Sequence, residues 1–287
     1  EYDRSFLKLC PNESIITAMD PDHMDIYGTP QAMFDAYTEF AILCDGPLLV
    51  HERIASHFTE RSNVTTYALG KTGTPRASDL RVVDGTYEFD LFAEGLELKG
   101  LRLGMPGRHN VENAIAASTV ALRLGVTPEL LREGLASFKG VARRFQTRVK
   151  GPRVVFIDDY AHHPKELDAC IASVREMYPG RSITGIFQPH LFSRTRDHAT
   201  EFGESLSALD DLLLLDIYPA REEPIAGINS AWLMDHVNMA AKTLCTRASL
   251  MDELGRRDLD VVLTLGAGDI DQLVAPIERL INERYKP

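Results

Sequence analysis

Two short apolar runs constrain this chain most, because each leads directly into a dense cluster of polar side chains. Residues 154–157 lead into 158–164, which hold two Asp and two His, and residues 183–187 lead into 188–196, which hold His190 and two Arg. Runs of this length and composition predict buried strands. Because ligands bind beyond the carboxyl ends of strands in open α/β sheets, we expect one site there. Its guanidinium and imidazole groups indicate an anionic substrate.

The second half of the chain repeats this strand–helix pattern. The expected strands are 153–159, 183–188, 211–217 and 260–265, and the expected helices are 165–177, 196–208, 230–241 and 270–284. Pro164 suits the first turn of a helix, and residues 247–254 should add a short strand and turn. The alternation predicts a parallel sheet with helices on both faces, a Rossmann-like domain that begins near residues 140–145.

The first half is more mixed. We expect strands at residues 14–19 and 47–50, β-hairpins over 78–103, and helices at 31–43, 110–124 and 127–137. Asp84-Gly85 is a typical hairpin turn, and Thr127-Pro128-Glu129 is a typical helix start. This order of elements also indicates an α/β domain.

Composition excludes several classes of protein. The net charge of -11 argues against a general nucleic-acid binder, so an anionic ligand would need a local basic pocket. No apolar run approaches the length of a membrane span. The cysteines lie far apart and form no metal or redox motif, so we expect buried thiols of a cytoplasmic protein. They are Cys10, Cys44, Cys170 and Cys245.

Two motifs in the first half allow both a functional and a purely structural interpretation. His23, between carboxylates at a strand end, could ligate a divalent cation or contact a phosphate, or it could only cap a turn. Gly107 precedes a helix start that favours anions. Asn110 and Asn113 should share one face of this helix and could read a base edge, although an Asn N-cap is the simpler interpretation.

Two glycine motifs are weak. Gly70-Lys71-Thr72-Gly73 resembles the end of a phosphate-binding loop, but Thr65 stands where that loop needs glycine and Pro75 prevents the following helix. We therefore expect a plain hairpin or loop. The glycine turn at residues 265–269 ends the last expected strand, and on its own it indicates little.

Taken in order, these motifs resemble the Mur ligase family. The matching segments run in family order across almost the whole chain: 1–7, 22–25, 107–113, 143–145, 158–164, 188–196 and 216–222. The last segment favours the alanine-adding branch. The resemblance implies an ATP-dependent amide ligase of peptidoglycan synthesis, which uses Mg²⁺ and joins L-alanine to UDP-N-acetylmuramate through an acyl phosphate. It also implies two domains: the C-terminal part of a truncated central ATP-binding α/β domain over residues 1–142, and a Rossmann-like ligase domain with a mostly parallel sheet over 143–287.

The resemblance assigns roles to particular residues. His23 would bind magnesium, and Asp159 would lie near the nucleotide. Adenine would be contacted from the helix start by His109, Asn110 and Asn113. The nucleotide phosphates would meet Arg143 or Arg144. The pocket for the amino acid and the acyl phosphate would be lined by Tyr160, His162, His190 and Arg194.

The chain also departs from the family pattern. It has neither a complete phosphate-binding loop of the Gly-Lys-Thr type nor the UDP-binding domain, and many alanine-adding relatives have Arg where this chain has Leu191. We therefore expect a fragment of a longer protein, inactive alone, whose apolar edge could drive a homodimer. Two alternatives stay open. One is a sibling ligase that recycles muramyl tripeptide, and the other is a non-catalytic ligase-like binding module.

Overall fold

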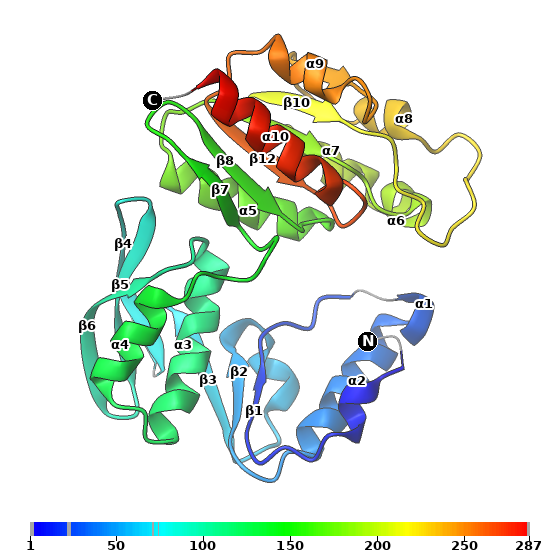
Figure 1. Ribbon diagram of the computed structural model, residues 1–287. Coiled ribbons are helices and arrows are strands. Elements are labelled where there is room, and N and C mark those ends of the chain that lie inside the picture. Colours follow the sequence, from blue (N-terminus) through cyan, green and yellow to red (C-terminus); the bar gives the residue numbers. More distant parts are fainter. Residues whose placement is uncertain (1–2, 22–23, 71, 74, 286–287) are drawn as a thin grey trace. The chain divides into compact units, whose positions relative to one another are not determined.

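The computed structural model describes residues 3–21, 24–70, 72–73 and 75–285. The chain divides into two compact units, Glu1–Gly104 with His109–Phe138, and Met105–Arg108 with Lys139–Pro287. Each unit is built on a six-stranded sheet (Figure 1). The expected fold class of two α/β sheets is therefore confirmed. Among the residues that the structure describes, no helix has both the length and the apolar character needed to cross a membrane.

The sheet of the first unit is parallel at one end and antiparallel at the other. Its strands lie in sequence order. They are β1 (Ser14–Ile16), β2 (Leu48–His51), β3 (Val64–Leu69), β4 (Arg76–Val83), β5 (Thr86–Ala93) and β6 (Leu96–Leu103). Pairing is parallel from β1 to β4 and antiparallel from β4 to β6. Asp84 and Gly85 both have positive φ, as a tight hairpin turn requires, which confirms the predicted hairpin. Strand β3 was not expected from the sequence.

Two helices of the first unit begin at threonine caps, of which the one at Thr127 was predicted from the sequence. The hydroxyl of Thr29 accepts a hydrogen bond from Ala32 N at 3.2 Å, and the hydroxyl of Thr127 accepts one from Leu130 N at 3.4 Å. The helices are α1 (Met24–Tyr27), α2 (Pro30–Ile42), α3 (Arg108–Arg123) and α4 (Pro128–Ser137), with 3₁₀ turns at Ser5–Lys8 and Glu52–Phe58. Residues of α2 pack on the apolar side chains of β1 and β2.

The sheet of the second unit is almost entirely parallel. Its strands are β7 (Gln146–Lys150), β8 (Val155–Asp159), β9 (Ile183–Phe187), β10 (Asp211–Leu214), β11 (Lys242–Leu244) and β12 (Val261–Leu265), in the order β11-β10-β9-β12-β8-β7. Only β7 pairs antiparallel, with β8 at the edge. Every residue of β8, β9 and β12 is buried, which explains why these strands are continuous apolar runs.

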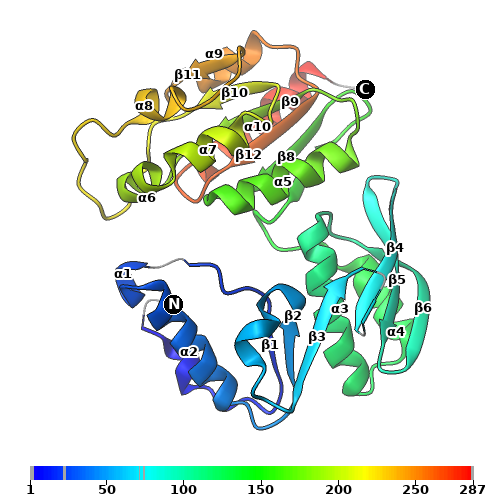
Figure 2. The same ribbon diagram turned by 180° about the vertical axis from the view of Figure 1, so that it is seen from behind.

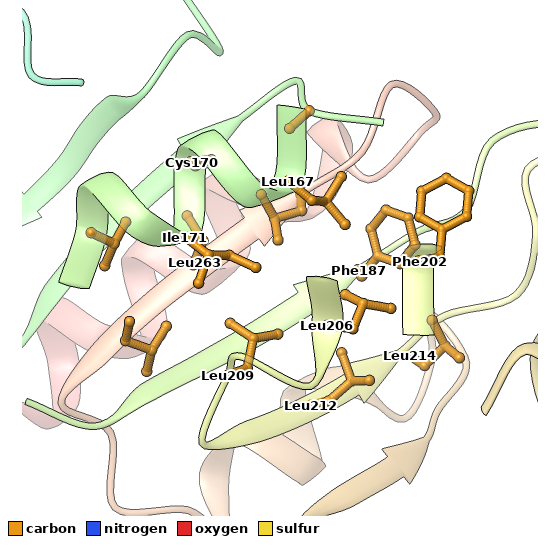
Figure 3. Packing of buried hydrophobic residues seen from close by; sticks show 14 of the residues in the cluster. Leu167, Cys170, Ile171, Phe187, Phe202, Leu206, Leu209, Leu212, Leu214 and Leu263 are labelled. Atoms are coloured by element: carbon orange, nitrogen blue, oxygen red, sulfur yellow. The ribbon is translucent and has the colours of Figure 1, made fainter. Parts of the chain in front are cut away.

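Helices cover both faces of this sheet, as predicted (Figures 1 and 2). One face packs against α5 (Pro164–Met177), α7 (Ala199–Leu206) and α8 (Ser230–Met234), and the other against α9 (Leu250–Gly255) and α10 (Asp271–Arg284). Figure 3 shows Leu167 and Ile171 of α5 and Leu206 of α7 in one apolar cluster with the sheet residues Phe187 and Leu263. This packing fixes the loops that carry the polar clusters.

Several expectations were wrong in detail. The strand expected within 247–254 is β11, earlier in the chain, and the segment forms helix α9 because Leu250 and Leu254, one helical turn apart, are both buried. The helix expected at 230–241 ends at Met234. The helix expected at 196–208 is two, α6 (Phe192–Asp197) and α7, divided at His198. All four thiols are free, and three are buried, but Cys10 is exposed.

Candidate active site

The register of the second sheet brings the two predicted clusters to one edge. Strands β8 and β9 both pair with β12, so that Asp159, Leu265 and Phe187 are aligned at their carboxyl ends. The segments 160–163, 266–269 and 188–191 therefore start side by side. The loop after β10 joins them, because Tyr218 N donates to Pro189 O at 2.8 Å and Leu191 N donates to Tyr218 O at 3.0 Å.

Four aromatic rings form a row along this edge. Tyr160 contacts His162 at 5.2 Å between ring centroids, His162 contacts His190 at 5.9 Å, and His190 stacks on Tyr218 at 5.7 Å. Three of these residues were predicted as site residues, from two different strand ends. Tyr218 was not, although it belongs to the segment 216–222 that carries the family resemblance.

The hydrogen-bond partners of His162 show which ring nitrogen carries the proton, that is, which tautomer of the neutral imidazole is present. Nδ1 lies 2.9 Å from Tyr160 O and 3.4 Å from a carboxylate oxygen of Glu166, and both oxygens can only accept. Nδ1 must therefore carry the proton. In the neutral imidazole Nε2 is then the acceptor nitrogen.

His190 is the opposite tautomer, with the proton on Nε2. Its Nδ1 faces Arg194 Nη1 at 3.5 Å, and because a guanidinium only donates, Nδ1 accepts and Nε2 carries the proton. Burial, together with the charge of Arg194, lowers the pKa of His190 to about 4. His190 is therefore neutral near pH 7 and offers an N–H group beside a fixed positive charge.

Two buried aspartates hold the loops in place. Asp159 accepts hydrogen bonds from Phe145 N and Ala161 N, each at 2.7 Å, and burial raises its pKa to about 6. Asp158 accepts a hydrogen bond from the Thr264 hydroxyl at 2.6 Å, and burial raises its pKa as well. The carboxylate of Asp159 thus organises the backbone around the site, and its predicted place near a nucleotide stays a prediction.

Arg143 and Arg144 both lie beside Tyr160. Arg143 Nη2 donates to Gly266 O at 2.5 Å, its Nε lies 3.6 Å from Asp158, and its guanidinium lies 5.0 Å from the Tyr160 ring. Arg144 lies 5.5 Å from the same ring and is half-exposed. Arg143 has positive φ, which turns the chain sharply where it enters the second sheet. Both guanidiniums thus place positive charge beside Tyr160, and their contact with nucleotide phosphates stays a prediction.

Three further residues at the edge were missed. Glu166, the third residue of α5, accepts backbone hydrogen bonds from His162 and His163. Glu222 accepts hydrogen bonds from the amide and hydroxyl of Ser193. Gln188 donates to Asp269 at 2.7 Å. Glu166 follows Pro164 at the capping-box position, which is a weak signal, whereas Gln188 and Glu222 belong to the segments 188–196 and 216–222 that carry the family resemblance.

The adenine-side residues lie in the first unit, at the start of α3. Because α3 begins at Arg108, Asn110 is its third residue and does not serve as its N-cap. Asn110 and Asn113 both lie within α3, three residues apart, and Asn110 is buried whereas Asn113 is exposed. His109 precedes them and is partly buried. Their contact with adenine stays a prediction.

The metal prediction cannot be examined on the structure, because His23 lies outside the described residues. Among the residues that are described, no group of three or more His, Cys, Asp or Glu side chains is placed to hold a metal ion. The assignment of magnesium to His23 thus rests on the sequence resemblance.

Comparison with known proteins defines the class of this chain. The Mur ligase middle domain matches residues 3–121, and the Mur ligase glutamate ligase domain matches residues 143–268. The chain belongs to the Mur ligase family and carries its middle and C-terminal domains. Within the family it is similar to UDP-N-acetylmuramate–L-alanine ligases: that of Parabacteroides distasonis is 45% identical over 290 residues, which cover 100% of this chain and 63% of the relative.

Solved structures show the same fold. The UDP-N-acetylmuramate–alanine ligase of Thermotoga maritima matches with a TM-score of 0.75 at 24% identity, over 99% of this chain and 61% of that one. The MurF ligase of Thermotoga maritima, solved in complex with ADP, matches with a TM-score of 0.73 at 18% identity, over 98% of this chain and 65% of that one. This chain therefore spans less than two thirds of the length of these relatives.

Proposed function

We propose that this chain acts within a longer UDP-N-acetylmuramate–L-alanine ligase, which uses ATP to join L-alanine to UDP-N-acetylmuramate in the cytoplasm. We call that longer protein the full-length ligase. The observation that carries the proposal is the pairing of His162 and His190 in opposite neutral forms beside Arg194. An amine substrate needs a proton acceptor, and a carboxylate or oxyanion needs donors and positive charge.

The proposed reaction has two steps. The carboxylate of UDP-N-acetylmuramate first attacks the γ-phosphorus of ATP, giving an acyl phosphate and ADP. The alanine ammonium loses one proton to solvent, and its nitrogen then attacks the acyl carbon to form a tetrahedral intermediate. A second proton leaves the nitrogen, and the bond to phosphate breaks, giving amide and inorganic phosphate. Mg²⁺, held by His23, would neutralise phosphate charge when bound.

The described residues suit the second step. His162 Nε2 is the acceptor that takes the second proton, while His190 and Arg194 donate to the alanine carboxylate or to the oxyanion. Arg143 and Arg144 add charge toward the phosphates of the nucleotide and of the acyl phosphate. The low pKa of His190 supports this division of roles, because a neutral His190 next to Arg194 adds a donor without a second buried charge.

The test is amide formation by the full-length ligase, followed by mass spectrometry of the product. We expect a product with L-alanine and none with the tripeptide that a recycling ligase would use. Arg194→Ala should lower kcat/KM for alanine by about 10²-fold, since it removes a charged donor. Arg196→Ala is the matched control, because Arg196 pairs with Asp197 at 2.7 Å and is exposed. Turnover with tripeptide alone, or equal loss in both variants, would refute the proposal.

A further inference from the structure

Glu166 contacts two parts of the site that lie apart in the sequence, the turn at residues 162–163 and Arg144. Its Oε2 accepts hydrogen bonds from His162 N at 3.0 Å and His163 N at 3.2 Å, and lies 3.4 Å from His162 Nδ1. Its Oε1 lies 3.8 Å from Arg144 Nη1. One carboxylate thus contacts the backbone of the catalytic turn, an imidazole within it, and a guanidinium from the segment before β7.

A helix cap alone accounts for only part of this arrangement. Glu166 is the third residue of α5, and its bond to His163 N is the usual reciprocal contact of a capping box. The bond to His162 N lies one residue further out, within the turn that carries the imidazole. The approach to His162 Nδ1 adds a negative charge on the side of the ring where Nδ1–H points. Of the two tautomers of neutral His162, that charge favours the one in which Nδ1 carries the proton.

We propose that Glu166 is a positioning residue, which holds the His162 turn and keeps the proton of neutral His162 on Nδ1, so that Nε2 is the nitrogen presented to the amino group of the substrate. The catalytic role inferred for Glu166 rests on the proposed function. The geometric part, the control of the His162 form by Glu166, does not depend on the reaction. Loss of that control would turn the acceptor nitrogen into a donor and remove the proton acceptor from the second step.

The direct readout is the protonation form of the His162 ring, from nitrogen NMR of the 287-residue chain near neutral pH. Wild type should show the proton on Nδ1. Glu166→Gln keeps an oxygen that accepts from the backbone, so the form should be retained. Glu166→Ala removes the carboxylate that accepts from His162 N and its charge, so the turn no longer holds Nδ1 against Tyr160 O, and we expect a mixture or the Nε2–H form. Asp168→Asn is the control, because Asp168 is exposed on the same helix.

Two outcomes would overturn the proposal. One is the Nε2–H form in wild type. The other is an unchanged Nδ1–H form in Glu166→Ala, with only a lower unfolding midpoint, because that would make Glu166 a helix cap and nothing more. Should Glu166→Ala fail to fold, Glu166→Gln still tests the assignment, since an Nε2–H form in that folded variant would contradict the retention expected from its backbone acceptor.

Kinetics of the full-length ligase separate this proposal from the proposed function. Glu166→Ala should lower kcat/KM for L-alanine by about 10²-fold, the usual effect of a misplaced reacting group, whereas Glu166→Gln should stay within about tenfold of wild type. Asp168→Asn should match wild type. An inactive wild type would refute the proposed function while the NMR result still decides the role of Glu166. An active Glu166→Ala variant with unchanged kcat/KM would overturn the positioning role.

Discussion

His162 and His190 come from different strand ends, lie 5.9 Å apart between ring centroids, and present opposite nitrogens as proton carriers. The carbonyl of Tyr160 and the carboxylate of Glu166 lie at Nδ1 of His162, and the guanidinium of Arg194 lies at Nδ1 of His190. A proton acceptor and a proton donor therefore stand together at the carboxyl edge of the second sheet. This arrangement suits the joining of an ammonium group to an activated carboxylate.

The stability of the chain should fall on acidification, in part through His190. Its folded pKa of about 4 lies below the ordinary value of 6.5, so between these values the unfolded chain binds more protons. The free energy of unfolding should therefore decrease as pH falls from about 6.5 toward 4. His190→Asn removes this contribution. Urea unfolding of both proteins across this range should show a weaker loss for the variant.

Asp159 should contribute a pH dependence of the free energy of unfolding that is opposite in sign to that of His190. Its folded pKa of about 6 lies above 3.8, so the folded chain binds more protons in that window and stability contributed by this group falls as pH rises. Asp159→Asn should therefore steepen the loss of stability on acidification, whereas His190→Asn should reduce it. Slopes that change in the same direction in both variants would contradict these pKa shifts.

Arg143 should matter far more to stability than its neighbour. Arg143→Ala leaves Asp158, which is almost fully buried, without its nearby cation, and should cost about 3 kcal/mol in the free energy of unfolding. Arg144→Ala removes a half-exposed charge and should cost at most about 1 kcal/mol. Chemical denaturation measures both. Equal costs would show that the Arg143 contacts contribute little.

Gly268 should tolerate no side chain. A Cβ there would lie 2.5 Å from Gln188 Oε1 and 2.7 Å from Tyr218 Cβ. Gly268→Ala should cost about 1–3 kcal/mol and should disturb Tyr218, which stacks on His190. Gly255→Ala, where a Cβ meets nothing within 4 Å, should be neutral or slightly stabilising. Thermal unfolding of the two variants tests this difference, and equal midpoints would contradict it.

The 287-residue chain alone should not turn over ATP when L-alanine is present. Its sequence holds no complete phosphate-binding loop to bind the β- and γ-phosphates, because Gly70-Lys71-Thr72 lacks the upstream glycine and the following helix. Phosphate release measured with ATP, Mg²⁺ and L-alanine should stay at background, and calorimetry reports whether ATP binds at all. Alanine-dependent phosphate release by this chain would contradict the expectation. The expected homodimer also stays a prediction, which sedimentation velocity can test.

The sequence was most informative where burial is complete. The runs that became β8, β9 and β12 have all residues buried, so their apolar composition predicted both the strands and the edge where they end. Strands β7 and β11 were not predicted, because they lie at the two edges of the second sheet and are only partly buried. A half-buried strand with mixed residues has no clear apolar period.

The position of the site side chains at one sheet edge was predictable from the sequence, whereas their protonation was not, and their roles stay predictions. His162, His190 and Arg194 follow strand ends and could be chosen from sequence. Their protonation forms could not, because these depend on a carbonyl and a guanidinium placed by tertiary structure. Glu166 was not predicted as a site residue for a related reason. An acidic residue in the first turn of a helix is common, and only the structure shows that Glu166 also contacts the His162 turn.

The most direct test of the account follows one oxygen atom. The full-length ligase would be given UDP-N-acetylmuramate labelled with ¹⁸O in its carboxylate, together with ATP, Mg²⁺ and L-alanine. An acyl phosphate requires one carboxylate oxygen to leave with phosphorus, so we predict one ¹⁸O in inorganic phosphate for each amide formed. Unlabelled phosphate, or no amide with L-alanine, would contradict the assignment of this chain to an alanine-adding ligase.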